Sequence, residues 1–354
     1  MLELDHAGVT DDFFAIGGHS LKGLQLFTRI QNTFGVSLPL ATLFKAPTIE
    51  KLAILVGGES TSSAANIPDT DTVADTVAVA VLRGSGHKSP IFSVHGGDGG
   101  VLFYKDFCDL LDEDRPFYAV EAPMLLDFQR PEAEESVEAT ATLYIEQLKT
   151  VRPTGPYIIG GFSFGGVVAY EIAQQLRIAG DDVELLVLFD TPNPARENEF
   201  KNSLWGRVAA NWQQNDNAGV LKKLKGLGER IGTGMVNKAQ HHAQLSATRR
   251  AVESSGTLDQ TQRLVHIREC HDALARKYVP TAYGGAMLLM RADNVADGFS
   301  FNREMGWDGL VGDLRIVDIP GDHEHIFYEP HAAELAAKFQ FELDRLEQAG
   351  ALVT

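Results

Sequence analysis

The stretch YIIGGFSFGGVVAYEIAQQL, residues 157–176, predicts how the larger part of this chain folds. An apolar run of strand length leads into GFSFG, and an apolar segment of helical period follows. The pattern Gly-x-Ser-x-Gly between a strand and a helix is typical of a nucleophile elbow, a turn so tight that its flanking positions need glycine. The sequence therefore predicts that Ser163 projects its hydroxyl from the end of a strand.

Apolar runs of strand length recur on both sides of this motif and alternate with segments of helical period. We expect strands at 77–82, 91–94, 157–160, 185–189, 286–290 and 315–319, and helices near 135–150, 165–179 and 331–347. This alternation predicts a mainly parallel sheet with helices on both faces. The stretch from about 195 to 278 interrupts it with a long, polar, helical pattern, so we expect a lid above the sheet.

A serine nucleophile needs a base, and an acid that orients the base, and both are expected further along the chain. In IPGDHEHIFYEPH, His323 follows a strand and a Pro-Gly turn directly, which favours it over His325 as the base. Asp190 ends the apolar run LLVLF, and Asp293 follows AMLLM. The residues alone leave the choice between these two acids open.

Two backbone N–H groups are expected to stabilise the oxyanion that forms when Ser163 attacks a carbonyl group. One belongs to Phe164, which starts the helix after the turn. The glycine-rich loop in FSVHGGDGGVLFY lets backbone approach a ligand closely, and we expect Gly97, or a neighbour within one residue, to supply the second. No third ligand accompanies the His-x-His pair near the C-terminus, so the sequence predicts no metal site.

A second serine lies near the start of the chain, in DDFFAIGGHSLKG, residues 11–23. Apolar residues at three- and four-residue spacing follow Ser20, and Gly35 ends the pattern, which predicts a helix between them. Thr48 is expected to cap a last short helix. On its own, Ser20 is typical of a helix cap.

The composition divides the chain into a small helical unit and a larger α/β unit. The stretch GESTSSAANIPDTDTVADT between them is poor in large apolar residues and predicts a flexible linker. We therefore expect a helical domain at 1–57, a linker at 58–76 and an α/β domain at 77–354.

Charge and composition exclude several classes of protein. The 354 residues are 44% hydrophobic, which suits a globular chain, and the formal net charge of -17 argues against nucleic acid or an anionic membrane surface as partner. No apolar run reaches the ~20 residues of a membrane helix. MLELDHAG has no signal-peptide features, and Cys108 and Cys270 show no metal-binding spacing, so we expect a cytoplasmic protein with reduced thiols.

The GGHS motif and the later segment TLFKAPTIEKLA resemble the peptidyl and acyl carrier domains of modular nonribosomal peptide and polyketide synthases. This resemblance implies that Ser20 carries a covalent 4'-phosphopantetheine, which a phosphopantetheinyl transferase attaches. The family's first helix would lie before residue 5, so we expect the carrier to be truncated at its N-terminus. The GGHSL form leans towards a peptide synthetase.

Residues 77 to about 348 are similar to the thioesterase domains that end such synthases, in GGFSFGG, LFDTPNP and IPGDHEHIFYEPH. The resemblance implies an α/β-hydrolase fold with a helical lid, upstream synthase modules as partners, and Asp190 rather than Asp293 as the acid. It also implies chain release in natural-product biosynthesis: a thioester on Ser20 passes to Ser163 and is released by hydrolysis or macrocyclisation. An editing-type hydrolase, a Claisen-type cyclase and a non-catalytic docking module are the alternatives.

Overall fold

The computed structural model describes residues 6–18, 20–36, 38, 40–57, 79–125, 135–196, 260–294 and 301–351. The expected linker at 58–76 lies outside these residues. So does most of the expected lid, because residues 197–259 are not described. None of the described helices combines the length and the hydropathy needed to cross a membrane.

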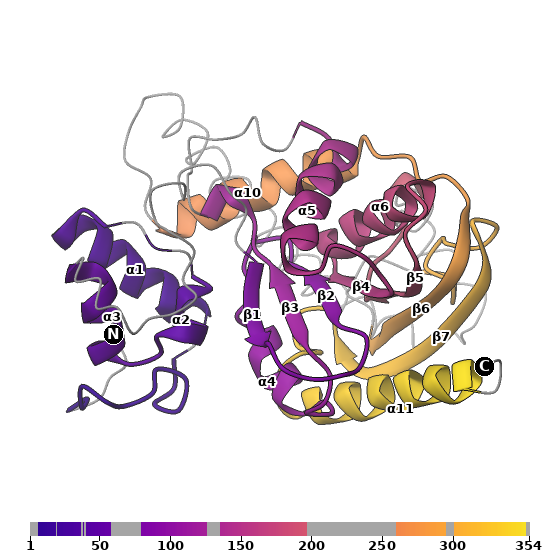
Figure 1. The fold of residues 1–354 in the computed structure, drawn as a ribbon. Coiled ribbons are helices and arrows are strands. Elements are labelled where there is room, and N and C mark those ends of the chain that lie inside the picture. Colours follow the sequence, from indigo (N-terminus) through magenta and orange to yellow (C-terminus); the bar gives the residue numbers. More distant parts are fainter. Residues whose placement is uncertain are drawn as a thin grey trace, which may run out of the picture.

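A sheet forms the centre of the α/β unit, and within the described residues it has seven strands in the order β1-β3-β2-β4-β5-β6-β7 (Figure 1). Strand β1 pairs antiparallel with β3, and the remaining neighbours are parallel. The strands are β1 (Val79–Arg83), β2 (Ile91–Val94), β3 (Phe117–Val120), β4 (Tyr157–Phe162), β5 (Val183–Phe189), β6 (Tyr283–Asn294) and β7 (Val311–Asp322). The mainly parallel sheet expected from the sequence is confirmed.

Helices cover both faces of the sheet, because each central strand sends apolar side chains to both sides. On one face lie α5 (Val137–Val151) and α6 (Phe164–Ile178), and on the other lie α4 (Tyr104–Asp109) and α11 (Ala332–Ala351) (Figure 1). In β4, Ile159 joins the core under α5 and α6, while its neighbour Ile158 joins the core that contains Phe107 of α4 and Phe339 of α11. Two separate apolar cores therefore hold the sheet rigid at its centre.

The N-terminal residues form the expected helical unit. Its helices are α1 (Ser20–Phe34), α2 (Thr42–Lys45) and α3 (Ile49–Gly57). Gly35 ends α1 with a φ of 74°, and the Thr48 hydroxyl oxygen accepts a hydrogen bond from the Lys51 N–H at 3.2 Å. Phe27 and Leu52 belong to a small apolar core of this unit. The helix end and the helix cap therefore lie where the sequence predicted them.

This helical unit packs against the edge of the α/β unit that carries β1 and β3 (Figure 1). Leu102 of the α/β unit belongs to the apolar core around Leu43 of α2. Beside them Glu121 is fully buried, and its carboxyl accepts a long hydrogen bond of 3.5 Å from the Ala41 N–H. Its other oxygen has no hydrogen-bond partner among the described residues, and burial raises the pKa of Glu121 to about 8. The contact between the two units thus buries the ionisable carboxyl group of Glu121 beside apolar side chains.

Candidate active site

The turn between β4 and α6 has the strained geometry of a nucleophile elbow. Ser163 has a φ of 55° and a ψ of −119°, in a region that side chains other than glycine rarely adopt. A Cβ atom on Gly161 would lie 2.1 Å from the carbonyl oxygen of Gly165, and one on Gly165 would lie 2.0 Å from that of His95. Only glycine fits at these two positions, as the sequence motif predicted.

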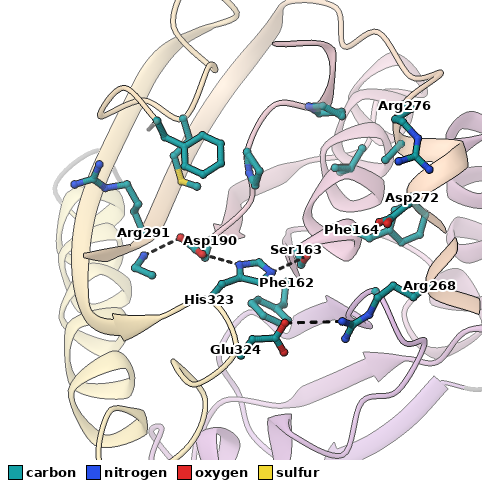
Figure 2. A pocket seen from close by; sticks show the side chains of 18 of the residues that line it. Phe162, Ser163, Phe164, Asp190, Arg268, Asp272, Arg276, Arg291, His323 and Glu324 are labelled. Atoms are coloured by element: carbon teal, nitrogen blue, oxygen red, sulfur yellow. Dashed lines mark hydrogen bonds and ion pairs between the residues drawn. The ribbon is translucent and has the colours of Figure 1, made fainter. Parts of the chain in front are cut away.

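Ser163 is the first member of a chain of hydrogen bonds (Figure 2). His323 Nε2 lies 3.0 Å from Ser163 Oγ, and His323 Nδ1 lies 2.7 Å from Asp190 Oδ2. Because an ionised carboxylate only accepts hydrogen bonds, Nδ1 of His323 carries the proton, and Nε2 of the neutral ring accepts from the Ser163 hydroxyl. The second oxygen, Asp190 Oδ1, accepts from the Ala292 N–H at 2.8 Å. The imidazole is therefore oriented to take a proton from Ser163.

Packing fixes the imidazole from the side. His323 lies on the turn directly after β7, and its ring stacks on Phe162 at a centroid distance of 4.8 Å. The side chain of Asp190 is 8% exposed and that of His323 is 35% exposed. The acid is thus shielded from water, while the base remains open to a substrate.

The rival residues lie elsewhere. The carboxylate of Asp293 accepts a hydrogen bond of 3.1 Å from the N–H of Gly321. Gly321 lies near the end of β7, which continues through the Pro-Gly pair where the sequence predicted a turn. His325 turns to Asp322, with 2.7 Å between Nδ1 and Oδ1. The structure therefore brings Asp190 and His323 to Ser163, and it brings neither Asp293 nor His325.

A cavity of about 410 Å³ opens in front of Ser163. Helix α10 (Gln260–Ala275), the described part of the expected lid, provides Arg268 and Asp272 to its wall (Figure 2). Apolar side chains such as Val167 and Met305 also line it. The pocket is therefore apolar at the sides and charged along α10.

Comparison with known proteins identifies the two units. Residues 89–326 match the family model described as a thioesterase domain, and residues 1–56 match the model described as a phosphopantetheine attachment site. The chain belongs to the thioesterase family. A carrier segment precedes its thioesterase domain, as the sequence predicted.

The relatives are synthetases much longer than this chain. The thioesterase and its carrier segment are 28% identical, over 98% of the chain and 14% of the relative, to a dimodular nonribosomal peptide synthase of Bacillus subtilis (strain 168). They are 27% identical, over 98% of the chain and 9% of the relative, to the chondramide synthase cmdD of Chondromyces crocatus. The chain therefore spans about a tenth of the length of these relatives.

Solved structures agree with this family and fold. The crystal structure of holo-AB3403, a four-domain nonribosomal peptide synthetase, has a TM-score of 0.59 and 26% identity, over 96% of this chain and 25% of that one. The NocB thioesterase domain in covalent complex with a fluorophosphonate nocardicin G analog has a TM-score of 0.53 and 27% identity, over 75% of this chain and 99% of that one. This thioesterase therefore has the α/β-hydrolase-like fold expected from the sequence.

Both expected oxyanion donors lie at the thioesterase pocket. Phe164 and Gly97 line the same cavity as Ser163. Phe164 is the first residue of α6, so its N–H has no partner within that helix. Gly97 lies on the loop after β2, where the backbone approaches α10. This arrangement is suited to holding a negatively charged oxygen near Ser163.

Sequence reasoning missed two buried histidines behind this loop. His95 Nδ1 lies 2.7 Å from the Gly96 carbonyl oxygen, and His271 Nδ1 lies 2.8 Å from that of Gly97. The signal for His95 was present in HGG, where a histidine adjoins the glycines of the loop. His271 gave no sequence signal, because it comes from α10 and reaches the loop only in the folded chain.

The start of the carrier segment fits a phosphodiester group. Ser20 is the first residue of α1, a helix of 15 residues with no acidic residue in its first turn. Gly17, three residues earlier, has a φ of 87°, and a Cβ atom there would meet nothing within 4 Å, whereas one on Gly18 would lie 2.4 Å from the Phe13 carbonyl oxygen. A helix N-terminus attracts an anion such as a phosphodiester. The residues present therefore suit 4'-phosphopantetheine.

The remaining sequence expectations concern a metal site and the two cysteines. Among the described residues, no group of three or more His, Cys, Asp or Glu side chains could hold a metal ion. Cys108 and Cys270 do not form a disulfide bond, and burial raises the pKa of Cys108 to about 11. Cys108 is therefore protonated at neutral pH, which suits a residue of the core and not a nucleophile.

Proposed function

We propose that this chain releases acyl or peptidyl groups from a nonribosomal peptide assembly line. The group is held as a thioester on the prosthetic group of Ser20 and passes to Ser163 before release. The hydrogen-bond chain from Ser163 through His323 to Asp190 carries this proposal, because it provides an activated hydroxyl beside an open pocket. The carrier segment in the same polypeptide supports a tethered substrate.

Ser20 is the proposed attachment site of 4'-phosphopantetheine. When bound, this group supplies a thiol that holds the acyl chain as a thioester on a long arm. The N–H groups that begin α1 stabilise its phosphate. The proposed linker at 58–76 lets Ser20 move relative to the pocket, and tethering raises the effective concentration of substrate there.

His323 acts first as a base and Asp190 holds it. His323 Nε2 takes the proton of the Ser163 hydroxyl as Oγ attacks the thioester carbonyl, and Asp190 stabilises the imidazolium that forms. The N–H groups of Phe164 and Gly97 stabilise the tetrahedral oxyanion. The proton on His323 then passes to the leaving sulfur, and the acyl group remains as an ester on Ser163.

Release repeats these steps with a second nucleophile. His323 removes a proton from water, or from a hydroxyl or amine of the acyl chain itself, and that group attacks the ester carbonyl on Ser163. Water gives a free acid, and an internal nucleophile gives a ring. The proposed lid at 195–278, which includes α10, determines which nucleophile reaches the ester by excluding or admitting water.

The proposed organisation is a carrier domain at 1–57, a linker at 58–76 and a thioesterase domain at 77–354. Upstream synthetase modules supply the chain to the carrier, and a phosphopantetheinyl transferase modifies Ser20. Both partners are expected in the cytoplasm.

The test is to follow a loaded acyl group to its product. A phosphopantetheinyl transferase loads the intact chain from a panel of acyl- and dipeptidyl-CoA, and mass spectrometry follows chain and product. We expect release from wild type, an acyl group retained on Ser163→Ala, and no loading of Ser20→Ala. Release at the wild-type rate from Ser163→Ala would contradict the proposal.

The product mass separates the alternatives. A free acid indicates hydrolysis, loss of one water relative to that acid indicates ring closure, and a new carbon–carbon bond indicates a Claisen-type cyclase. An editing-type hydrolase would clear short acyl groups from separate carriers as fast as from its own Ser20. The release of no acyl group from the panel would favour a docking module over an enzyme.

A further inference from the structure

Three aromatic rings stack behind the proposed oxyanion donors. The ring of His271, on α10, lies on that of Phe164 with a centroid distance of 4.3 Å and an interplanar angle of 6°. On its other side the ring of His271 stacks on that of His95, with a centroid distance of 5.0 Å and an interplanar angle of 27°. Both histidines are fully buried. Neither has a role in the proton transfers described above.

The hydrogen bonds of His95 fix its tautomer. Its Nδ1 lies 2.7 Å from the Gly96 carbonyl oxygen, which only accepts, so Nδ1 carries the hydrogen. Its Nε2 lies 2.7 Å from the hydroxyl of Tyr144 on α5, which therefore donates to the neutral ring. His95 is thus held between the loop and the core of the domain.

These contacts determine the direction of the Gly97 N–H. The C=O of Gly96 and the N–H of Gly97 belong to one planar trans peptide, so they point in opposite directions. Anchoring the Gly96 oxygen on His95 therefore aims the Gly97 N–H away from His95. His271 anchors the next peptide through the Gly97 oxygen, at 2.8 Å from its Nδ1.

Side-chain packing does little to restrict the backbone of Gly97. A Cβ atom there would meet only the Arg268 side chain, at 3.9 Å, within a 4 Å radius. A glycine in open surroundings samples many backbone conformations, and in most of them its N–H would not point towards the oxyanion on the group bound to Ser163. The two histidines on consecutive carbonyl groups, together with the Gly99 N–H that donates to the Gly96 oxygen at 3.0 Å, restrict this freedom.

We propose that His271 is a positioning residue that couples helix α10 to the oxyanion hole. It contacts both donor residues, Gly97 through a hydrogen bond and Phe164 through ring stacking. Helix α10 therefore governs stabilisation of the transition state, in addition to forming a wall of the pocket. This inference rests on the proposed function, since it assumes that Ser163 forms the oxyanion.

Two substitutions separate the contacts of His271. His271→Asn keeps an N–H near the position of Nδ1 and loses the stacked ring, whereas His271→Phe keeps the ring and loses the hydrogen bond. One lost donor costs ~10² to 10³ in rate, so we expect each variant to lower kcat by ~10-fold or more. KM should stay within about twofold, because the ground state does not use the oxyanion hole.

The matched control is His266, five residues earlier on α10. Its Nε2 lies 3.6 Å from Cys270 Sγ, and it does not line the pocket. His266→Phe should leave kcat and KM unchanged.

A second measurement is the affinity for phenylboronic acid, whose tetrahedral adduct with Ser163 places an oxygen in the oxyanion hole. We expect weaker binding to both His271 variants and unchanged binding to His266→Phe.

The experiment uses the full chain and the acyl group that wild type releases fastest, supplied in solution as an acyl-pantetheine thioester so that both kcat and KM can be measured. If both His271 variants keep the wild-type kcat and boronate affinity, the inference is wrong even though Ser163→Ala is inactive. If Ser163→Ala keeps activity, the proposed function fails instead. A rise in KM alone would show that His271 shapes only the binding pocket, and would also overturn the inference. Circular dichroism of the Phe variant, which keeps a buried ring, checks that the fold is intact.

Discussion

The two serine turns of this chain, GGHS at 17–20 and GGFS at 160–163, share a sequence pattern and differ in their surroundings. Each places a serine at the start of a helix of 15 residues. The second glycine is crowded in both turns, since a Cβ atom would lie 2.4 Å from the Phe13 carbonyl oxygen at Gly18 and 2.1 Å from the Gly165 carbonyl oxygen at Gly161.

The turns differ two residues after the serine, where the first has Lys22 and the second has Gly165, whose Cβ atom would lie 2.0 Å from the His95 carbonyl oxygen. The comparison teaches that the Gly-Gly-x-Ser pattern does not by itself make a nucleophile. The elbow of Ser163 also needs close packing around the turn and a base that the fold brings to the hydroxyl, here His323.

The largest expected difference between the two serines concerns the base. His323→Ala should lower kcat for release by ~10⁴ to 10⁶, because Ser163 then has no proton acceptor. Modification of Ser20 by a phosphopantetheinyl transferase should keep its rate. Chain-release kinetics and intact-mass measurements check both. His325→Ala is the control, and a comparable loss in that variant would contradict the assignment of His323.

The acid gives the next largest effect. Asp190→Asn should lower kcat by about 10⁴, the size seen when a triad acid is replaced by its amide, because the amide disfavours the reactive tautomer of His323. Asp293→Asn keeps an oxygen for the N–H of Gly321, so its kcat should stay within about threefold of wild type. The two variants are compared in one release assay. Equal losses would show that the acid has been misassigned.

Glycine substitutions test the packing difference directly. Gly165→Ala should destabilise the chain by about 3 kcal/mol or more and abolish release, because its Cβ would lie 2.0 Å from the His95 carbonyl oxygen. Gly17→Ala should cost only about 1 to 2 kcal/mol, the penalty of a left-handed backbone in open space. Chemical denaturation of both variants measures the contrast. Similar losses of stability would remove the basis of the comparison.

The contact between the two units gives the smallest effect, and it depends on pH. The pKa of Glu121 is raised from a usual 4.5 to about 8, chiefly by burial and to a smaller extent by the nearby Asp98, while hydrogen bonds from the N–H groups of Ala41 and Leu40 act in the opposite direction. The contribution of Glu121 to the free energy of unfolding is therefore most favourable below about pH 4.5, where the carboxyl is protonated in both states. This contribution is lost as the pH rises through about 8, where the buried carboxyl must ionise.

Glu121→Gln should remove this pH dependence. We expect wild type to lose about 1 to 3 kcal/mol relative to Glu121→Gln between pH 5 and pH 8, because the buried carboxyl must ionise or become exposed. Denaturation at a series of pH values measures the difference. A difference that does not vary with pH would show that Glu121 is not buried in solution.

Local patterns predicted most of the fold. Strand β2 has the predicted bounds, and the run that forms β5 was recognised from LLVLF. Strand β3 was missed because FYAV is only four residues long and follows the polar segment DEDR. Helix α4 was missed for a similar reason, since six residues cover less than two turns. Short elements depend on tertiary packing more than on their own periodicity.

The site shows what a single sequence leaves undecided. The elbow at Ser163 is a local feature, so its motif and its glycines were visible. The choice between Asp190 and Asp293 depends on how β5, β6 and β7 align, and no local pattern encodes that. His271 contacts Gly97 across 174 positions of sequence, so only the folded chain reveals it. Residues 197–259, where most of the predicted lid lies, are outside the described structure.

The central claim is that one polypeptide passes a single acyl group from Ser20 to Ser163. Rapid-quench peptide mapping by mass spectrometry, on wild-type chain loaded at Ser20, locates that acyl group over time. The account predicts that the label leaves the Ser20 peptide, appears as an ester on the Ser163 peptide, and only then appears in product. Product that forms without any label on Ser163, or label on a different residue, would contradict it.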